Sequence, residues 1–69
     1  MPNRITLAKR ADLEDRAAER AADVARQAEA LGHFDGAETL WRTARRCRVE
    51  SLKLRALAVA GKAQDWRFG

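Results

Sequence analysis

The sequence predicts an all-α fold, an antiparallel two-helix hairpin that dimerises into a four-helix assembly. Residues 6–31 contain no glycine or proline and are dense in Ala, Arg and Glu, which favour helix. Apolar residues there and in residues 36–60 recur at steps of three and four, the spacing of one helical face. A chain of 69 residues buries too little core for comfortable stability alone, so we expect association with a second copy.

The first helix is predicted over residues 6–31, with Asn3 or Thr6 as its cap. Asp12 precedes Arg16 by one helical turn, which predicts an ion pair on the outer face. We expect the apolar face to form core and dimer contacts; its members are Leu13, Ala17, Ala21, Val24, Ala28 and Leu31. A second row widens this face and consists of Ala11, Ala18, Ala22 and Ala25.

A corner is predicted at residues 32–35. Gly32 can adopt the left-handed conformation that ends a helix. Asp35 is expected to cap the next helix, with Glu38 three residues later at the spacing of a capping box. Because the connection is so short, the two helices must be antiparallel neighbours.

The second helix is predicted over residues 36–60, with a kink or break within residues 45–51 and a stop at Gly61. Trp66 and Phe68 in the tail, residues 61–69, are expected to dock on the hairpin or on a second chain. The apolar face of this helix comprises Ala37, Leu40, Trp41, Ala44, Cys47, Ser51, Leu54, Leu57 and Ala58.

Composition places the chain as one domain in the cytoplasm. Neither a signal peptide nor a membrane span is expected, because the longest apolar run covers only residues 56–60. Cys47 is the only cysteine, which excludes a disulfide within the chain and suits a reducing compartment. Cys47 is interpreted as a small core residue; the alternative is an intersubunit or redox-sensing thiol whose pKa neighbouring arginines lower.

No constellation for catalysis or metal binding is present in the sequence. His33 is the only histidine, so no Cys/His cluster exists and we expect neither metal nor cofactor. A role for His33 in capping the first helix is favoured over a catalytic role, because no partner residues accompany it. Two helices also enclose no cleft of substrate size, so the chain is not expected to be an enzyme.

Charge is distributed unevenly along the chain. Residues 1–34 carry six basic and six acidic residues, whereas residues 35–69 carry eight and four, so the net charge of +4 lies in the second half. Arg42, Arg45 and Arg46 fall on one side of the predicted helix. Such a row is a solvated helix face, a clamp for carboxylates of a protein partner, or a track for nucleic-acid phosphates. No aromatic residue interleaves the arginines, which disfavours nucleic acid.

Trp41 permits two interpretations. It packs between the two helices, since a small core needs its largest side chain, or it anchors a partner, since Trp and Arg are enriched at interface hot spots. Glu38 and Arg42 flank it one turn apart.

The corner carries two resemblances. The pattern of Gly32, Phe34, Ala37, Trp41 and Ala44 resembles the turn and second helix of a tetratricopeptide-type hairpin, of which only one unit fits in the chain. A closer resemblance, carried by residues 28–44 in the pattern Ala-Glu-x-x-Gly-x-Phe-x-x-Ala-x-x-Leu-Trp-x-x-Ala, is to the small ANR and PerC-like regulators of bacteria and phages and to similar phage-encoded anti-activators. Downstream the sequence departs from that family pattern, because residues 52–60 are aliphatic apart from Lys53 and Arg55, and Trp66 comes late.

The resemblance implies a helical, dimeric regulator that binds a transcriptional activator of the AraC or LuxR type and inhibits it. Trp41 would then be the apolar anchor, and Glu38 and Arg16 would give supporting polar contacts. The expected carboxylate clamps are Arg42, Arg45 and Arg46. Two alternatives stay open: direct nucleic-acid binding by the basic helix, and inhibition of another host protein complex by a phage protein.

Overall fold

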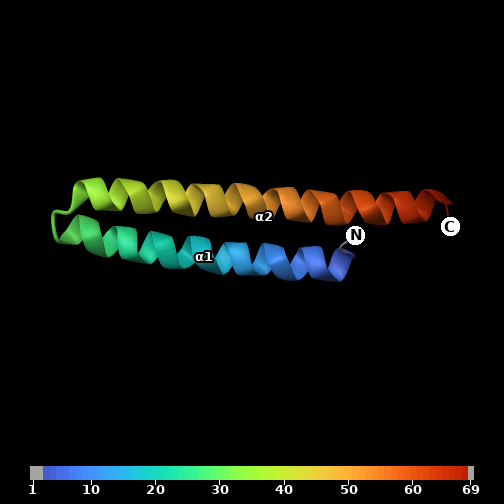
Figure 1. The fold of residues 1–69 in the computed structure, drawn as a ribbon, viewed down its shortest axis with the longest axis horizontal. Helices are drawn as coiled ribbons and strands as arrows, with labels where there is room; N and C mark the ends of the chain where they lie inside the picture. Colours follow the sequence, from blue (N-terminus) through green and yellow to red (C-terminus); the bar gives the residue numbers. More distant parts are fainter. Residues whose placement is uncertain (1–2, 69) are drawn as a thin grey trace.

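The computed structural model describes the backbone of residues 3–68 and the side chains of residues 3–60. Two helices account for nearly all of it, α1 over Arg4–Ala30 and α2 over Phe34–Phe68. They run antiparallel side by side and make a rod of 56 × 15 × 14 Å (Figure 1). The predicted all-α helical hairpin is thereby confirmed.

Helix α1 begins at Arg4, two residues earlier than predicted, because Asn3 is its cap. The backbone N–H of Thr6 donates to Asn3 Oδ1 over 2.8 Å, which satisfies one of the donors that a helix start leaves free. Of the two candidate caps, Asn3 therefore caps the helix and Thr6 lies inside the first turn.

The corner is tighter than predicted and covers residues 31–33. Gly32 has the expected left-handed conformation, with φ of 82°. The N–H of Gly32 donates to Glu29 O over 3.0 Å, and the N–H of His33 donates to Ala28 O over 2.8 Å. This pair of bonds is a Schellman motif, which satisfies the last carbonyls of α1 within three residues.

The predicted capping box at the start of α2 is wrong. Since the Schellman motif ends at His33, α2 begins at Phe34 and Asp35 lies in its first helical turn. A carboxylate there is favoured by the helix dipole without acting as the cap. Glu38 accepts instead from Arg42 Nη2, one turn further along α2.

A seam of small residues joins the helices. On α1, Ala11, Ala18 and Ala25 recur every seven residues, and each is at most 1% exposed. Ala37, Ala44 and Ser51 repeat the same spacing on α2 and are at most 2% exposed. A seven-residue repeat keeps one face of each helix on the seam, and small side chains let the two backbones approach closely.

Larger side chains close the two ends of the seam. At the open end, Leu7 and Ala11 of α1 pack with Leu54 of α2. Near the corner, half-buried Trp41 packs against Ala44 and Ala21, together with neighbouring Ala22. Among the side chains described, the largest that is fully buried is that of Ser51, so the hairpin core is thin.

The row chosen from the sequence for the core of α1 is only partly correct. Ala21 is buried and Leu54 of α2 is buried as expected, whereas Leu13, Val24 and Leu31 are exposed. Half-buried residues of the predicted core flank the seam, namely Ala17, Ala28 and Leu40. Both rows of α1 satisfy helical spacing, but the all-alanine row permits the closer approach to α2, so the larger residues remain outside.

Helix α2 continues to Phe68, past the predicted stop at Gly61, and neither a kink nor a break interrupts residues 45–51. Helix-forming residues follow Gly61, and a single internal glycine costs a helix only about 1 kcal/mol relative to alanine. α2 therefore extends beyond the start of α1 (Figure 1). The expected docking of Trp66 and Phe68 lies outside the described side chains. Within residues 3–68, neither helix has a stretch long and apolar enough to cross a membrane.

Candidate protein-interaction surface

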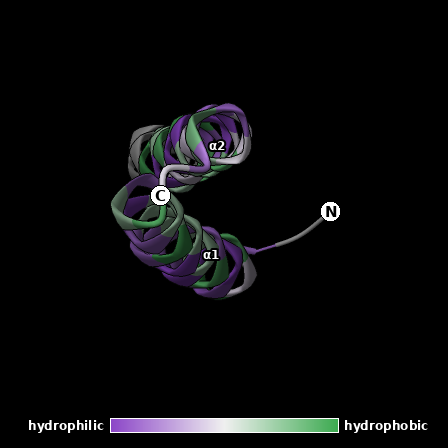
Figure 2. Cartoon of the chain, turned by 90° about the vertical axis from the view of Figure 1, so that its left-hand side faces the viewer, coloured by the Kyte–Doolittle hydropathy of each residue, from purple (hydrophilic) through white to green (hydrophobic). Residues whose placement is uncertain are grey.

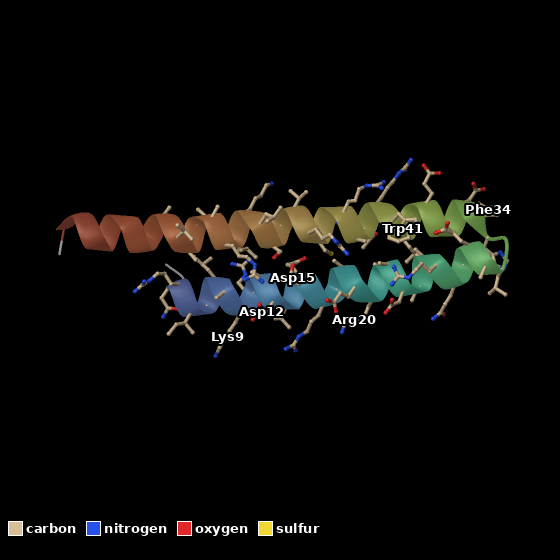
Figure 3. All side chains as sticks on the ribbon, turned by 180° about the vertical axis from the view of Figure 1, so that it is seen from behind. Lys9, Asp12, Asp15, Arg20, Phe34 and Trp41 are labelled. Carbon is tan, nitrogen blue, oxygen red and sulfur yellow. The ribbon has the colours of Figure 1, made fainter. Side chains whose placement is uncertain are left out.

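Trp41 is held between the helices by three kinds of contact. Its Nε1–H donates to Glu29 Oε1 over 2.6 Å, and its ring packs on the alanines of the seam. The guanidinium carbon of Arg26 lies 5.9 Å from the ring centroid, within the range of a cation–π interaction. The interpretation of Trp41 as a residue packed between the helices is confirmed (Figure 3). Only the remaining exposed part of its ring can contact a partner.

The predicted arginine row is exposed on α2. Arg42, Arg45 and Arg46 lie on the side away from α1, because Ala44 between them and Cys47 directly after them are buried against α1. Arg42 Nη2 lies 2.7 Å from Glu38 Oε1, and both side chains are more than half exposed. Ion pairs of this kind contribute little to stability, so Arg42 is available to a competing carboxylate.

Arg16 lies apart from this row. It precedes buried Ala18 by two residues, about 200° around the helix, and so lies on the outer side of α1. Arg20, one turn further along, is drawn pointing away from α2 in Figure 3. The hairpin therefore places Arg16 and the arginine row on opposite outer sides, and one small partner surface cannot contact both.

An ion-pair cluster that sequence reasoning missed joins the helices near the middle of α1. Arg55 Nη2 lies 3.1 Å from Asp12 Oδ1 and 2.6 Å from Asp15 Oδ2, and Arg55 Nε donates to Ser51 Oγ over 3.4 Å. The Ser51 hydroxyl and then the Arg55 guanidinium lower the pKa of Asp15. The predicted Asp12–Arg16 pair is thus replaced by a contact between helices. The feature of the sequence that could have predicted this contact is the pair of carboxylates Asp12 and Asp15, three residues apart beside the apolar face of α1.

Cys47 is buried, as expected for a small core residue. Burial raises the pKa of its thiol, and the carboxylate of Glu14 raises it further. The predicted lowering of this pKa by neighbouring arginines is therefore wrong, because burial and the Glu14 carboxylate outweigh the opposing charge of Arg46. The arginines next to Cys47 in the sequence do not bring their charges close to its sulfur, because the Cys47 side chain is buried in the seam.

A second apolar row on α2 was also missed. Val49, Leu52 and Val59 are 50%, 67% and 67% exposed. With exposed Ala56 they are spaced three, four and three residues apart, which puts them on one face of the helix. Figure 2 shows hydrophobic residues in green on the outside of both helices as well as between them.

The described residues contain no group of three or more His, Cys, Asp or Glu side chains placed to hold a metal ion. No protein-family model matches the chain, and neither a curated protein nor a solved structure resembles it significantly. The fold and surface define the chain as a helical hairpin with a basic, partly apolar outer face.

Proposed function

We propose that this protein is a small cytoplasmic regulator that binds a bacterial transcriptional activator and inhibits it by protein–protein contact. The observation that carries the proposal is the exposed row of Arg42, Arg45 and Arg46 on the outer side of α2. Among the side chains described, neither Arg45 nor Arg46 forms an ion pair. Arginine binds carboxylates through two parallel hydrogen bonds, which makes such a row suited to an acidic protein surface.

The supporting contacts fall into two groups. Glu38 lies beside the row and holds Arg42 over 2.7 Å, so it orients one member of the row toward a partner. Trp41 offers only the part of its ring that is not covered by the seam, and Arg16 requires a second contact on the other helix. We therefore assign the main partner contact to the three arginines and a secondary one to Trp41 and Arg16.

The proposed regulator is a homodimer that forms a four-helix assembly. Leu13, Val24 and Leu31 are exposed in the single hairpin, while the only large aliphatic side chains buried among those described are Leu7 and Leu54. Burial of the exposed row against a second copy would supply the apolar area that the seam lacks. Sedimentation equilibrium should give twice the chain mass, and Val24→Glu with Leu31→Glu should give the monomer. A wild-type protein that sediments as a monomer contradicts the dimer.

The test of partner binding is capture by the tagged protein from a bacterial lysate, with and without nuclease, at two salt concentrations. We expect retention of a DNA-binding activator of the LuxR or AraC type after nuclease treatment. Arg45→Glu with Arg46→Glu should reduce capture at least tenfold while the circular dichroism spectrum stays helical. Lys9→Glu with Arg20→Glu makes the same change in net charge on the outer side of α1 and is the matched control.

Two other outcomes would overturn the proposal. Recovery of nucleic acid alone, lost steeply at the higher salt, would assign the arginine row to phosphates, because such binding releases counterions. Recovery of a protein that does not regulate transcription would assign the chain to inhibition of another host complex.

A further inference from the structure

Helix α2 has apolar residues on two nearly opposite faces. The inner face meets α1 through Cys47, Ser51 and Leu54. The outer face carries Val49, Leu52, Ala56 and Val59, which we call the outer row. Since each residue turns the helix by about 100°, Leu52 lies well round the helix from Leu54, which packs against α1. A helix that is apolar on two sides requires a second neighbour on the side its own hairpin leaves free.

The outer row continues toward the corner as a basic stripe. Arg42 and Arg45 precede Val49 at the same alternating steps of three and four. From Arg42 to Val59 this face is about 26 Å long at 1.5 Å per residue. The face is therefore long enough to pack along one helix of about 18 residues.

Positive charge borders the outer row. Arg46 and Lys53 lie one position after Arg45 and Leu52, so they follow one edge of the row. Neither forms an ion pair among the side chains described, whereas Arg55 is engaged by Asp12 and Asp15. The only acidic residue between positions 39 and 60 is Glu50. The cations of this face that form no ion pair among the side chains described are thus Arg45, Arg46 and Lys53, with exposed Arg48 one position before Val49 on the other edge of the row.

These positive charges indicate which kind of partner can bind the outer face of α2. A second copy that packed through the same face would bring two sets of Arg45, Arg46 and Lys53 to one contact, and like charges at such a seam oppose pairing. A helix with an apolar row bordered by Asp and Glu matches both the spacing and the sign. We infer that the outer face of α2 binds an amphipathic helix of a partner protein whose apolar row is bordered by acidic residues. This inference rests on the proposed function in that the partner is a protein bound by α2.

The binding mode is a helix packed along a helix. The outer row inserts between apolar residues of the partner helix, and its exposed leucine and valines supply the apolar contact area. Arg45, Arg46 and Lys53 pair with carboxylates at the edge of the contact, which fixes the register and excludes helices with basic borders.

The experiment titrates the wild-type protein into dye-labelled synthetic helices of 21 residues and follows fluorescence anisotropy. One peptide has Leu and Val at heptad core positions and Glu at the bordering positions; a second has Lys in place of Glu; a third has Ser in place of the core residues. We expect binding of the Glu-bordered peptide, weakened by salt, and at least tenfold weaker binding of the other two. Equal binding of the Glu-bordered and Lys-bordered peptides overturns the inference.

Variants locate the contact. Leu52→Ser with Val59→Ser should weaken binding of the Glu-bordered peptide at least tenfold, whereas Ile5→Ser, at an exposed position of α1, should leave it unchanged. Arg45→Glu with Lys53→Glu should reverse the preference, so that the Lys-bordered peptide binds better. Circular dichroism confirms that each variant stays helical. Unchanged binding by the Leu52 and Val59 variant overturns the assignment to this face, and so does a loss of dimer mass in that variant.

The peptide titration requires no activator, so the two proposals fail separately. If an activator is captured but the Glu-bordered peptide does not bind, the proposed function stands and this inference is wrong. If the peptide binds and no activator is captured, the helix-binding face stands and the identity proposed for the partner is wrong.

Discussion

Arg55 of α2 lies 2.6 Å from Asp15 of α1, a contact between residues 40 positions apart in the chain. Asp12 shares the same guanidinium group, and Ser51 beside it is buried in the seam. The pair fixes the register of the helices beside Ser51 of the seam. It also removes Arg55 from the set of cations available to a partner, whereas Arg45, Arg46, Arg48 and Lys53 form no ion pair among the side chains described.

The lowered pKa of Asp15 predicts a loss of stability in acid. Its carboxyl has a lower pKa in the folded chain than the ordinary value of 3.8, so its contribution is complete above that value and is lost as the pH falls through the folded-state pKa. Urea unfolding followed by circular dichroism should therefore show wild type losing more stability than Asp15→Asn between pH 5 and about pH 2. Arg55→Ala should reduce this pH dependence, and Lys53→Ala should not. Identical pH profiles for wild type and Asp15→Asn would refute the coupling.

Alanine substitutions of Gly32 in the corner and of Gly36 in the first turn of α2 should change the stability of the hairpin in opposite directions. Gly32→Ala should destabilise the hairpin by about 1–2 kcal/mol, because Gly32 has a φ of 82° that a side chain disfavours. Gly36→Ala should stabilise it by about 0.5–1 kcal/mol, because Gly36 lies within α2 and an added Cβ meets no atom within 4 Å. An added Cβ at Gly32 also meets no atom, so backbone conformation alone separates the pair. Thermal unfolding of both variants measures the difference, and two shifts of the same sign would contradict the Schellman corner.

The alanine seam predicts a strong effect of added volume. Ala18→Leu should destabilise the hairpin by about 1–3 kcal/mol or more, since the residue is 1% exposed and the helices must separate to admit the larger side chain. Ala8→Leu adds the same atoms at an exposed position of α1 and should change the free energy of unfolding by less than about 0.5 kcal/mol. Urea denaturation gives both values. Equal tolerance at the two positions would mean that the helices do not meet at Ala18.

Substitutions of Trp41 and Glu29 should separate the contribution of the Trp41 ring to stability from the contribution of its hydrogen bond. Trp41→Phe removes the N–H that donates to Glu29 and should cost about 1–2 kcal/mol. Glu29→Gln keeps an acceptor oxygen and should cost less. Trp41→Ala should cost about 3 kcal/mol, at the lower end for aromatic truncation because the ring is half-buried. Chemical unfolding ranks the three variants, and a neutral Trp41→Ala would return this residue to the role of a partner anchor.

Local signals predicted most of the fold. Helical spacing and the absence of glycine and proline identified both helices, and the left-handed preference of Gly32 located the corner between them. The capping box was misplaced because Asp35 and Glu38 match its spacing equally well inside a first turn. The end of α2 was misplaced because one glycine is a weak stop when helix formers follow it.

Contacts between the helices were harder to predict. Two rows of α1 obey the same spacing, and the choice of the alanine row depends on the matching small residues of α2, which lie far away in the chain. The pairing of Arg55 with Asp15 depends on the same register. The exposure of the arginine row followed from its spacing, but the separation of Arg16 from it required the arrangement of both helices. The outer row escaped notice because the inner face of α2 already accounted for helical spacing in that segment.

The alanine seam has a consequence for how this protein responds to temperature. The heat capacity of unfolding arises chiefly from apolar surface that becomes hydrated, and a core whose largest fully buried side chain, among residues 3–60, is Ser51 has little of it to expose. The heat-capacity increment of the hairpin should fall below the usual value of about 12–15 cal/mol/K per residue. Its stability curve is then less curved, so the stability of the hairpin keeps rising on cooling to lower temperatures than in a protein with a larger core, and its cold denaturation moves further down in temperature.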